Sequence, residues 1–305
     1  MSTNSFTPLQ ASVLRWYEKN GRHSLPWRNV ADLGVDPGYG VMVSEFMLQQ
    51  TQVERVIPKY TAFLKRFPTV ESLASASVSD VIALWSGLGY NRRAVLLHRA
   101  AQTIHTLYSD DVPHGIDTLK SIPGIGPYTA GAIAAFSYNE PVAMVDTNIE
   151  RFYELLFWGY EKPSVKEVAT FAQSYVPSAC SRAWHSAIMD LMTCVRKRRT
   201  PLEQQQSLLE ELAFIPRWTL PLLGSKPFAR PKQSSFVGSR RSFRGRIIAY
   251  LTSCENHQAS LSQVGDILPS DMPYKLEELI EGLVKDGLLT ILPGSTEPIL
   301  SLSPQ

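Results

Sequence analysis

One acidic residue, Asp146, lies in a stretch of apolar neighbours, where a carboxyl group could serve acid–base or electrostatic chemistry. It follows Val145 and precedes Thr147 and Asn148. A carboxylate at this place is either the N-cap of a helix that begins near Asn148 or a partly desolvated catalytic group. The two roles are compatible, because a cap fixes the orientation of the carboxylate.

A second acid, Glu45, precedes several amide side chains. Helical spacing of i, i+4 and i+7 would place Glu45, Gln49 and Gln52 on one face. An acid with two amides beside it could grip a nucleobase, because amides offer both donors and acceptors to the edge of a base. An ordinary polar helix face is the alternative, and the spacing alone leaves both open.

The segment from Leu119 to Phe136 has the pattern of a helix, a tight turn and a second helix. The turn is Pro123-Gly-Ile-Gly126, in which Gly124 and Gly126 would allow positive φ angles and leave backbone amides uncovered. The N-terminus of the following helix adds its dipole, so a phosphate group could be bound without any side chain. The pattern is typical of a helix-hairpin-helix motif that contacts DNA, or of a structural turn between packed helices.

The elements that must position these residues are mostly helical. Between residues 40 and 220, apolar side chains recur at intervals of three and four, and turn residues separate segments of helical length. Prolines and serines then predict a linker over residues 216–245. Beyond it we expect three short helices and two strands, in the arrangement of a winged helix: Arg246–Leu251, Leu261–Leu268, Lys275–Asp286, Leu288–Leu292 and Ile299–Leu302.

Charge is distributed unevenly along the chain. The 30 basic and 28 acidic side chains of the 305 residues give a net charge of only +2, which by itself indicates neither a nucleic acid nor an acidic partner. Residues 191–254 nevertheless hold twelve basic and three acidic side chains, a charge of +9 that leaves −7 for the rest. Such a basic band is the electrostatic footprint expected for a polyanion, and a solvated linker is the alternative.

The cysteines and the hydropathy pattern indicate the compartment. Cys180, Cys194 and Cys254 are too few and too scattered for a disulfide framework or a thiolate metal site. We recognise no signal peptide and no apolar segment long enough to span a bilayer. We therefore expect a soluble protein of the reducing cytosol, with no membrane partner.

Together these features resemble the MutY-type adenine DNA glycosylases of the helix-hairpin-helix DNA glycosylase superfamily, over residues 12 to about 200. The matching segments are Leu25-Pro-Trp-Arg28, Val43-Ser-Glu-Phe-Met-Leu-Gln-Gln-Thr-Gln-Val53, Leu84-Trp-Ser-Gly-Leu-Gly-Tyr90, Ile122-Pro-Gly-Ile-Gly-Pro-Tyr-Thr-Ala-Gly-Ala-Ile133 and Val145-Asp-Thr-Asn148. The resemblance implies an all-α, two-lobed glycosylase body over residues 1–215. Within it, a six-helix barrel is expected at about 29–140, and the second lobe from 1–28 plus 141–215. A basic linker (216–245) and a small winged-helix-like α+β domain (246–305) would follow.

The resemblance also implies an activity. It is that of a monofunctional enzyme of base excision repair, which flips and hydrolyses adenine paired with 8-oxoguanine or guanine in double-stranded DNA. In the family, the acid at the position of Glu45 protonates N7 of adenine, which turns a poor anionic leaving group into a neutral one. The acid at the position of Asp146 stabilises the oxocarbenium-like sugar as the bond to the base breaks. Tyr128 occupies the position where strand-nicking relatives carry a Schiff-base lysine, so it implies no strand cleavage, and we expect it to hydrogen-bond near Asp146.

Contacts with DNA follow from the same resemblance. Gln49 and Gln50 match residues that sit beside the lesion pair, and Gln50 is the better candidate to enter the duplex. Tyr90 matches an aromatic wedge next to 8-oxoguanine, which lowers the cost of flipping. Arg28 and Asn148 match residues of the base pocket.

The chain departs from the family at its cofactor and at its C-terminus. The family usually binds a [4Fe–4S] cluster through four cysteines, of which only the first, Cys194, is present, while the other positions hold Pro201, Gln204 and Glu210. We therefore expect no cluster and no metal, with residues 202–214 helical in its place. The region after the linker is too short for the Nudix-like domain that many members carry.

Two other functions remain open at the level of the sequence. A thymine or uracil glycosylase for mismatches with guanine is one, although Glu45 favours adenine, because pyrimidines have no N7 to protonate. A non-enzymatic DNA-binding protein that uses the winged helix is the other, but binding to the DNA backbone needs neither Glu45 nor Asp146. We expect a monomer in the cytosol of a bacterium.

Overall fold

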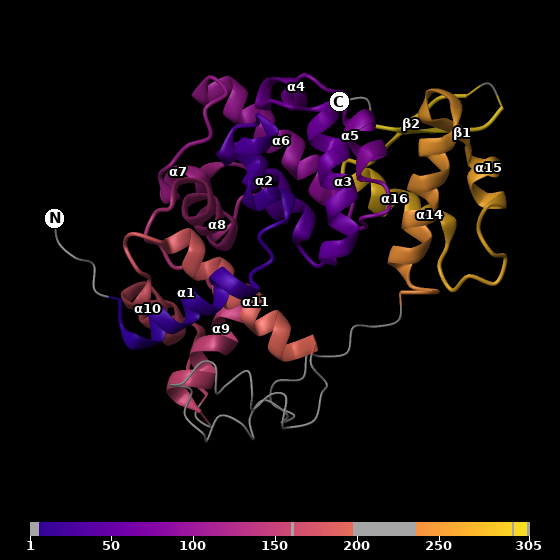
Figure 1. Ribbon diagram of the computed structural model, residues 1–305. Helices are drawn as coiled ribbons and strands as arrows, with labels where there is room; N and C mark the ends of the chain where they lie inside the picture. Colours follow the sequence, from indigo (N-terminus) through magenta and orange to yellow (C-terminus); the bar gives the residue numbers. More distant parts are fainter. Residues whose placement is uncertain (1–5, 160–161, 198–235, 295, 304–305) are drawn as a thin grey trace. The chain divides into compact units, whose positions relative to one another are not determined.

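The computed structural model describes residues 6–159, 162–197, 236–294 and 296–303 (Figure 1). The predicted helix over 202–214 and the predicted linker up to residue 235 lie outside these ranges. Backbone contacts divide the chain into two compact units. The first unit comprises Met1–Asn29, His114–Lys120 and Gly126–Pro231, and the second comprises Val30–Pro113, Ser121–Ile125 and Lys232–Gln305.

The described part of the first unit is helical. Its elements are α1 (Pro8–Asn20), η1 (Pro26–Arg28), α7 (Ile116–Ser121, of which the last residue belongs to the second unit), α8 (Pro127–Tyr138), α9 (Thr147–Tyr153), η3 (Glu154–Trp158), α10 (Val165–Tyr175) and α11 (Ser181–Lys197). Their apolar faces meet in a core rich in aromatic rings. Trp184 of α11 is fully buried there and meets the ring of Phe152 edge-on, with the ring centroids 5.8 Å apart. This core fixes α9, and therefore the segment that precedes it.

The second unit begins with a block of helices. These are η2 (Val30–Leu33), α2 (Pro37–Leu48), α3 (Val53–Arg66), α4 (Val70–Ala74), α5 (Val78–Trp85) and α6 (Arg92–Tyr108). Helix α2 starts sharply, because the Asp36 carboxylate accepts a hydrogen bond from the backbone N–H of Tyr39 and Pro37 occupies the first helical position, which needs no donor. Every residue from Gly38 to Met47 is buried, so α2 has no exposed polar face.

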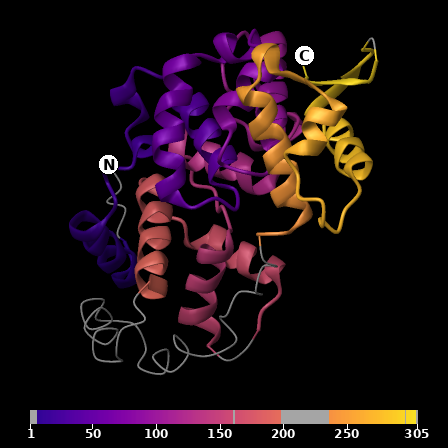
Figure 2. The ribbon, with the colours of Figure 1, turned by 90° about the vertical axis from the view of Figure 1, so that its right-hand side faces the viewer.

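The second unit also contains the C-terminal elements. They are α14 (Arg240–Ser253), η6 (Glu255–His257), β1 (Gln258–Ser260), α15 (Leu261–Asp266), α16 (Leu276–Lys285), β2 (Leu289–Leu292) and β3 (Ile299–Leu302). The strands form an antiparallel sheet in the order β1-β3-β2, and β2 and β3 make a hairpin (Figure 2). The predicted mostly helical fold with a small C-terminal α+β region is confirmed.

Two details of this region differ from the prediction. Helix α14 begins at Arg240 rather than Arg246, because the Ser239 hydroxyl accepts a hydrogen bond from the backbone N–H of Ser242 and caps the helix there. Strand β1 was not predicted, since its three residues are too few to show an alternating pattern.

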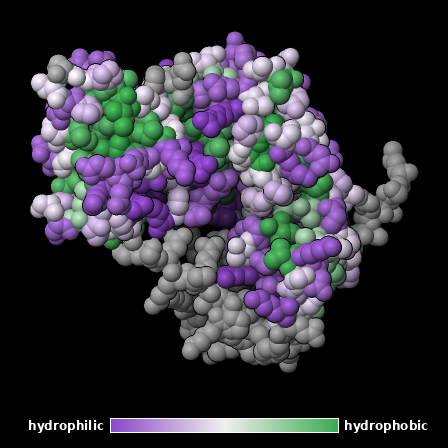
Figure 3. All heavy atoms as spheres, turned by 180° about the vertical axis from the view of Figure 1, so that it is seen from behind, coloured by the Kyte–Doolittle hydropathy of each residue, from purple (hydrophilic) through white to green (hydrophobic). Residues whose placement is uncertain are grey.

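No helix in the described part of the chain is both long and apolar enough to cross a membrane. The C-terminal elements do expose some apolar side chains, among them Val284 and Ile291. Figure 3 shows apolar side chains gathered on this part of the chain, at the left of the view, beside a hydrophilic band.

Candidate functional site

Glu45 lies near the end of α2 in the second unit and is 6% exposed. Its neighbours along the chain, Ser44 and Phe46, are buried as well. The helix therefore holds this carboxyl group away from bulk solvent. Burial is one of the ways in which proteins prepare a carboxyl group to act as a general acid.

The polar helix face predicted for Glu45, Gln49 and Gln52 is wrong, because α2 ends at Leu48. Gln49 follows as its C-cap, and Gln52 is the N-cap of α3. Between them Gln50 is exposed and takes the left-handed conformation, with φ +55°. The amide side chains thus lie on a tight turn, where the chain presents Gln50 outward. This placement suits the predicted entry of Gln50 into a duplex.

Tyr90 lies on the loop between α5 and α6. It is 37% exposed and has a positive φ of 48°, after Gly87 and Gly89, which also have positive φ. A non-glycine residue pays a steric penalty in this conformation, so its surroundings must hold it there. The indole N–H of Trp85 helps to stabilise the loop, because it donates a hydrogen bond to the carbonyl of Gly89 at 3.2 Å.

The two hairpin glycines have different reasons to be glycine. Gly124 has φ +81°, and a Cβ there would come within 2.9 Å of Cβ of Leu96 and 3.2 Å of the ring of Phe46. Gly126, by contrast, has φ −87° and is the N-cap of α8, so the prediction of a positive φ there is wrong. A Cβ on Gly126 would meet nothing within 4 Å. Gly124 is needed for close packing, whereas Gly126 leaves open space at a helix N-terminus, where an anion can bind.

Asp146 is the N-cap of α9 in the first unit, as one of the two alternatives predicted. One carboxylate oxygen accepts hydrogen bonds from the backbone N–H groups of Asn148 and Ile149, both at 2.8 Å. The other oxygen accepts from the side-chain amide of Asn148 at 2.8 Å. A carboxylate has no proton to donate, so three donated N–H bonds suit an ionised side chain in a fixed orientation. Asn148 therefore acts on Asp146 directly.

The segment leading to Asp146 is held by a buried histidine that the sequence did not single out. His185 of α11 is 1% exposed, and burial lowers its pKa to about 4. Its Nδ1 is 2.8 Å from the carbonyl of Ser181, and its Nε2 accepts from the backbone N–H of Met144 at 3.5 Å. A neutral imidazole fills both roles, as donor and as acceptor.

Tyr128 lies in the first turn of α8 and is half-buried. It packs against a small cluster formed by Ala132, Ala135 and Met144. Gly131 lets α8 approach this segment, because a Cβ there would already be 3.4 Å from Cβ of Met144. Tyr128 and Asp146 are thus attached to the same packed segment of the first unit.

The structure gives Arg28 a partner within the first unit. Its guanidinium donates two hydrogen bonds to Asp190, at 2.6 and 2.9 Å, and Arg22 binds the same carboxylate through its backbone N–H and its Nε. Burial alone would raise the pKa of Asp190, but the hydrogen bonds and charges of Arg28 and Arg22 hold it below the usual value. This network ties the N-terminal segment to α11. Asp190 was not predicted from the sequence, because its partners lie 162 and 168 residues away.

Metal ligands do not gather among the residues that the structure describes. No group of three or more His, Cys, Asp or Glu side chains there could hold an ion. Cys194 is half-buried and packs against the core of the first unit. The positions of Pro201, Gln204 and Glu210 lie outside the described residues.

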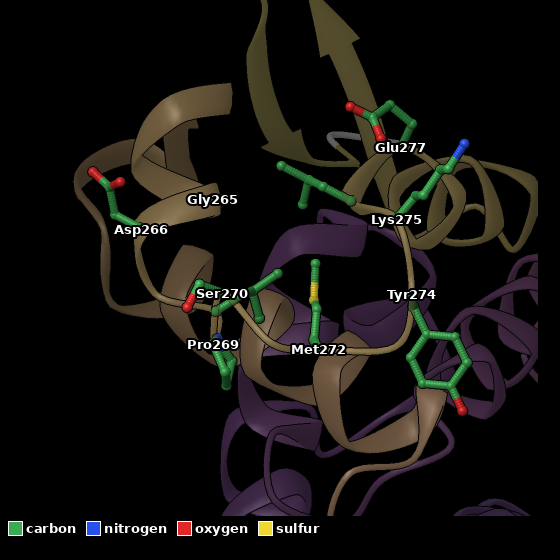
Figure 4. Close-up of a pocket in the computed structure, with 10 residues that line it drawn as sticks. Gly265, Asp266, Pro269, Ser270, Met272, Tyr274, Lys275 and Glu277 are labelled. Atoms are coloured by element: carbon green, nitrogen blue, oxygen red, sulfur yellow. The ribbon is translucent and has the colours of Figure 1, made fainter.

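A cavity of about 560 Å³ opens in the C-terminal region, along the segment from α15 to the start of α16 (Figure 4). Its lining includes Asp266, Ser270, Lys275 and Glu277. None of the predicted site residues lines it, so this cavity gives no support to the predicted chemistry.

Comparisons with known proteins place the chain in a family. Residues 43–178 match the HhH-GPD superfamily of base excision DNA repair proteins. The chain is 34% identical over 287 residues to the adenine DNA glycosylase of Mycolicibacterium smegmatis, with 93% of each chain covered. It is 39% identical over 285 residues to the adenine DNA glycosylase of Mycobacterium tuberculosis, with 92% of this chain and 89% of the relative covered.

A solved structure of a thermostable thymine-DNA glycosylase shares the fold. It superposes with a TM-score of 0.57 at 24% identity and covers 63% of this chain and 88% of its own. The family match and the mycobacterial relatives show that the chain belongs to the MutY-type branch of the HhH-GPD superfamily and is a DNA glycosylase of base excision repair, a hydrolase of N-glycosidic bonds.

Proposed function

We propose that this glycosylase removes adenine from double-stranded DNA in which the adenine is mispaired with 8-oxoguanine or guanine. The observation that carries the proposal is the burial of Glu45, which is 6% exposed in α2. The relatives that match most of the chain's length are adenine DNA glycosylases. Adenine leaves most easily once N7 is protonated, and a buried carboxyl group is suited to hold that proton.

Glu45 serves as the general acid. It delivers a proton to N7 of the flipped adenine, so the base departs as a neutral molecule rather than as an anion. Thymine and uracil have no N7, and a buried acid at this place would bring their release no such gain.

Asp146 serves as the charged partner. Its three N–H donors, from Asn148 and Ile149, keep it ionised and oriented while positive charge develops on the sugar. One acid that holds a proton and one that stays ionised is the division of labour known from glycoside hydrolysis. Tyr128, which is not an amine, forms no Schiff base with the sugar, so the strand stays intact. The enzyme acts as a monomer on the DNA of the bacterial cytosol.

A [4Fe–4S] cluster does not fit the donor set of this chain. Such a cluster needs four thiolates, and the chain has three cysteines, Cys180, Cys194 and Cys254. Cys180 directly precedes α11 and Cys194 lies in its last turn, about 20 Å apart at 1.5 Å per residue. We therefore propose a clusterless member.

The cluster proposal predicts purified protein without iron. Elemental analysis of protein expressed and purified without oxygen should find less than about one iron atom per ten chains, and no absorbance near 410 nm. About four iron atoms per chain, with a brown colour, would contradict the proposal.

Base release from defined duplexes tests the proposed function. Under single-turnover conditions with saturating enzyme, we expect adenine release from A:8-oxoguanine and A:G duplexes, and none from G:T or G:U duplexes. Glu45→Gln should slow adenine release by about 100-fold or more and Asp146→Asn by a similar factor, with duplex binding within a few-fold of wild type. Glu54→Gln, which neutralises an exposed acid in the first turn of α3, is the matched control. Wild-type rates in the Glu45 or Asp146 variant, or thymine release, would refute the proposal.

A further inference from the structure

Arg93 is an arginine of the first turn of α6 whose side chain is buried, at 7% exposure. Its neighbour Arg92 has the same charge but a side chain that is 68% exposed, with Asp286 at 3.9 Å. The burial of a full positive charge costs free energy unless hydrogen bonds compensate for it. Arg93 donates hydrogen bonds to two separate parts of the chain.

One edge of the guanidinium group binds the end of α2. Its Nη1 atom donates to the carbonyls of Phe46, Met47 and Gln49, at 2.7, 3.0 and 2.6 Å. The last carbonyls of a helix have no partner within the helix. Arg93 supplies one from a distant element, and α2 ends there, immediately before the left-handed turn at Gln50.

The other N–H groups bind the loop that carries Tyr90 and the hydroxyl of Thr51. Nη2 donates to the carbonyl of Gly89 and to the hydroxyl of Thr51, each at 3.0 Å. Nε lies 3.4 Å from the carbonyl of Tyr90. The guanidinium also lies over two aromatic rings, at 5.3 Å from the centroid of Trp85 and 5.6 Å from that of Tyr90.

A planar guanidinium with donors at fixed angles can satisfy both loops at once, whereas an ammonium group cannot. Burial lowers the pKa of Arg93 to about 10, so the group keeps its charge at neutral pH. The turn at Gln50 and the loop at Tyr90 are thus held to one rigid group. A shift of either loop would leave a buried donor or carbonyl without its partner.

Resting on the proposed function, and on the entry of Gln50 and Tyr90 into the duplex beside the lesion pair that the resemblance implies, we propose that Arg93 is a positioning residue that holds these two side chains as a single wedge for opening the base pair. It acts through Gln50 and Tyr90 and touches neither the adenine nor the sugar. Its contribution is to the opening of a pair, which takes a stacked base out of the duplex, and not to bond cleavage.

The test compares Arg93→Lys with Arg92→Lys, two substitutions that keep the charge. Single-turnover adenine release is measured with saturating enzyme on A:8-oxoguanine and A:G duplexes, and on a duplex in which adenine faces an abasic site and has no pair to open. Arg93→Lys should slow release from the two paired substrates by about tenfold to 100-fold, the range typical of small misplacements in a site. Its loss on the unpaired adenine should be within about threefold, and Arg92→Lys should stay within about twofold on all three substrates.

Thr51→Val provides a milder second variant in case Arg93→Lys folds poorly. It removes the hydroxyl that accepts from Nη2 and keeps the size of the side chain, so it should show the same substrate pattern with a smaller loss. Equal losses on paired and unpaired adenine, in whichever of the two variants folds, would overturn the inference and leave Arg93 a purely structural residue. If wild-type protein releases no adenine from any duplex, the proposed function fails instead.

Discussion

Glu45 and Asp146 are both carboxyl residues, but the chain surrounds them differently. Glu45 is enclosed in a helix that is buried along most of its length, whereas Asp146 is half-buried and caps a helix with three N–H donors. Burial by itself disfavours the charged form of a carboxyl group, whereas several N–H donors favour it. The proposed function gives the two carboxyl groups opposite roles, one as the acid and one as the charged partner.

At the residue scale we predict a pH dependence of stability caused by His185. Its pKa falls from an ordinary 6.5 to about 4 in the folded chain, so the unfolded chain binds more protons between these values. The contribution of His185 to the free energy of unfolding is fully present above about pH 6.5. It decreases as the pH falls towards 4, by up to about 3 kcal/mol. Urea unfolding at pH 7 and at pH 5 measures this decrease.

His185→Asn is the variant that checks the assignment. It removes the titrating group, so the stability difference between pH 7 and pH 5 should shrink, even if the variant is less stable at both. His98 is also buried with a lowered pKa, and it should account for the remainder of the slope. A variant with the full wild-type slope would show that His185 does not titrate in this range.

At the scale of elements, the predicted site residues lie on turns as well as on helices. Gln50 and Tyr90 both lie on turns with positive φ, and the hairpin before α8 contains Gly124 packed on Phe46. Contacts with another element hold each of these turns in addition to its local hydrogen bonds. The precision of the site therefore depends on packing between elements that are far apart in the chain.

This dependence limits what the sequence could predict. Local patterns sufficed for the helical body, the hairpin, the wing and the cap at Asp146, because each depends on residues within a few positions. The end of α2 was mispredicted because its carbonyls are satisfied by Arg93, 44 to 47 residues away. Nothing in the spacing distinguishes Arg93 from Arg92. The sequence therefore does not show that Arg93 is buried with several hydrogen-bond partners whereas Arg92 is exposed.

The hairpin gives a prediction for two glycines. Gly124→Ala should lower the free energy of unfolding by about 3 kcal/mol, because the new Cβ meets Leu96 and Phe46 and a left-handed φ is strained for alanine. Gly126→Ala should change stability by less than about 1 kcal/mol, since a Cβ there meets no atom within 4 Å. It should instead weaken duplex binding, by crowding the N-terminus of α8. Urea unfolding and duplex titrations measure the two effects, and equal destabilisation by both variants would contradict this division.

At the scale of the whole molecule, the charge of the C-terminal region bears on its function. Residues 246–305 hold three basic and eight acidic side chains, and α16 carries Glu277, Glu278 and Glu281. In the predicted winged helix, α16 is the second helix of the helix-turn-helix, and in DNA-binding helix-turn-helix proteins that helix enters the major groove. Its acidic side chains would repel phosphates, which disfavours a regulator that binds DNA through this helix.

Three arginines lie at the start of α14, just before residue 246, and they are not equivalent. Arg240 pairs with Glu278 at 2.8 Å, and Arg244 pairs with Asp286. Arg241 instead donates a hydrogen bond to the hydroxyl of Tyr90 and lies 5.2 Å from the centroid of its ring. Of these three arginines, it is Arg241 that the structure joins to a predicted DNA-contacting residue.

We therefore expect Arg241 to accompany Tyr90 to the DNA and to meet a phosphate there. Arg241→Ala should weaken duplex binding by about threefold to tenfold at low salt and reduce the slope of log K against log salt concentration by about one, the loss of one phosphate contact. Arg240→Ala should leave the slope unchanged, because Glu278 already neutralises that guanidinium. Adenine release with saturating enzyme should stay within about twofold in both variants. Duplex titrations at several salt concentrations measure both the affinity and the slope. Tighter binding by Arg241→Ala would contradict the prediction and show that this arginine covers Tyr90 and must move away before DNA can bind.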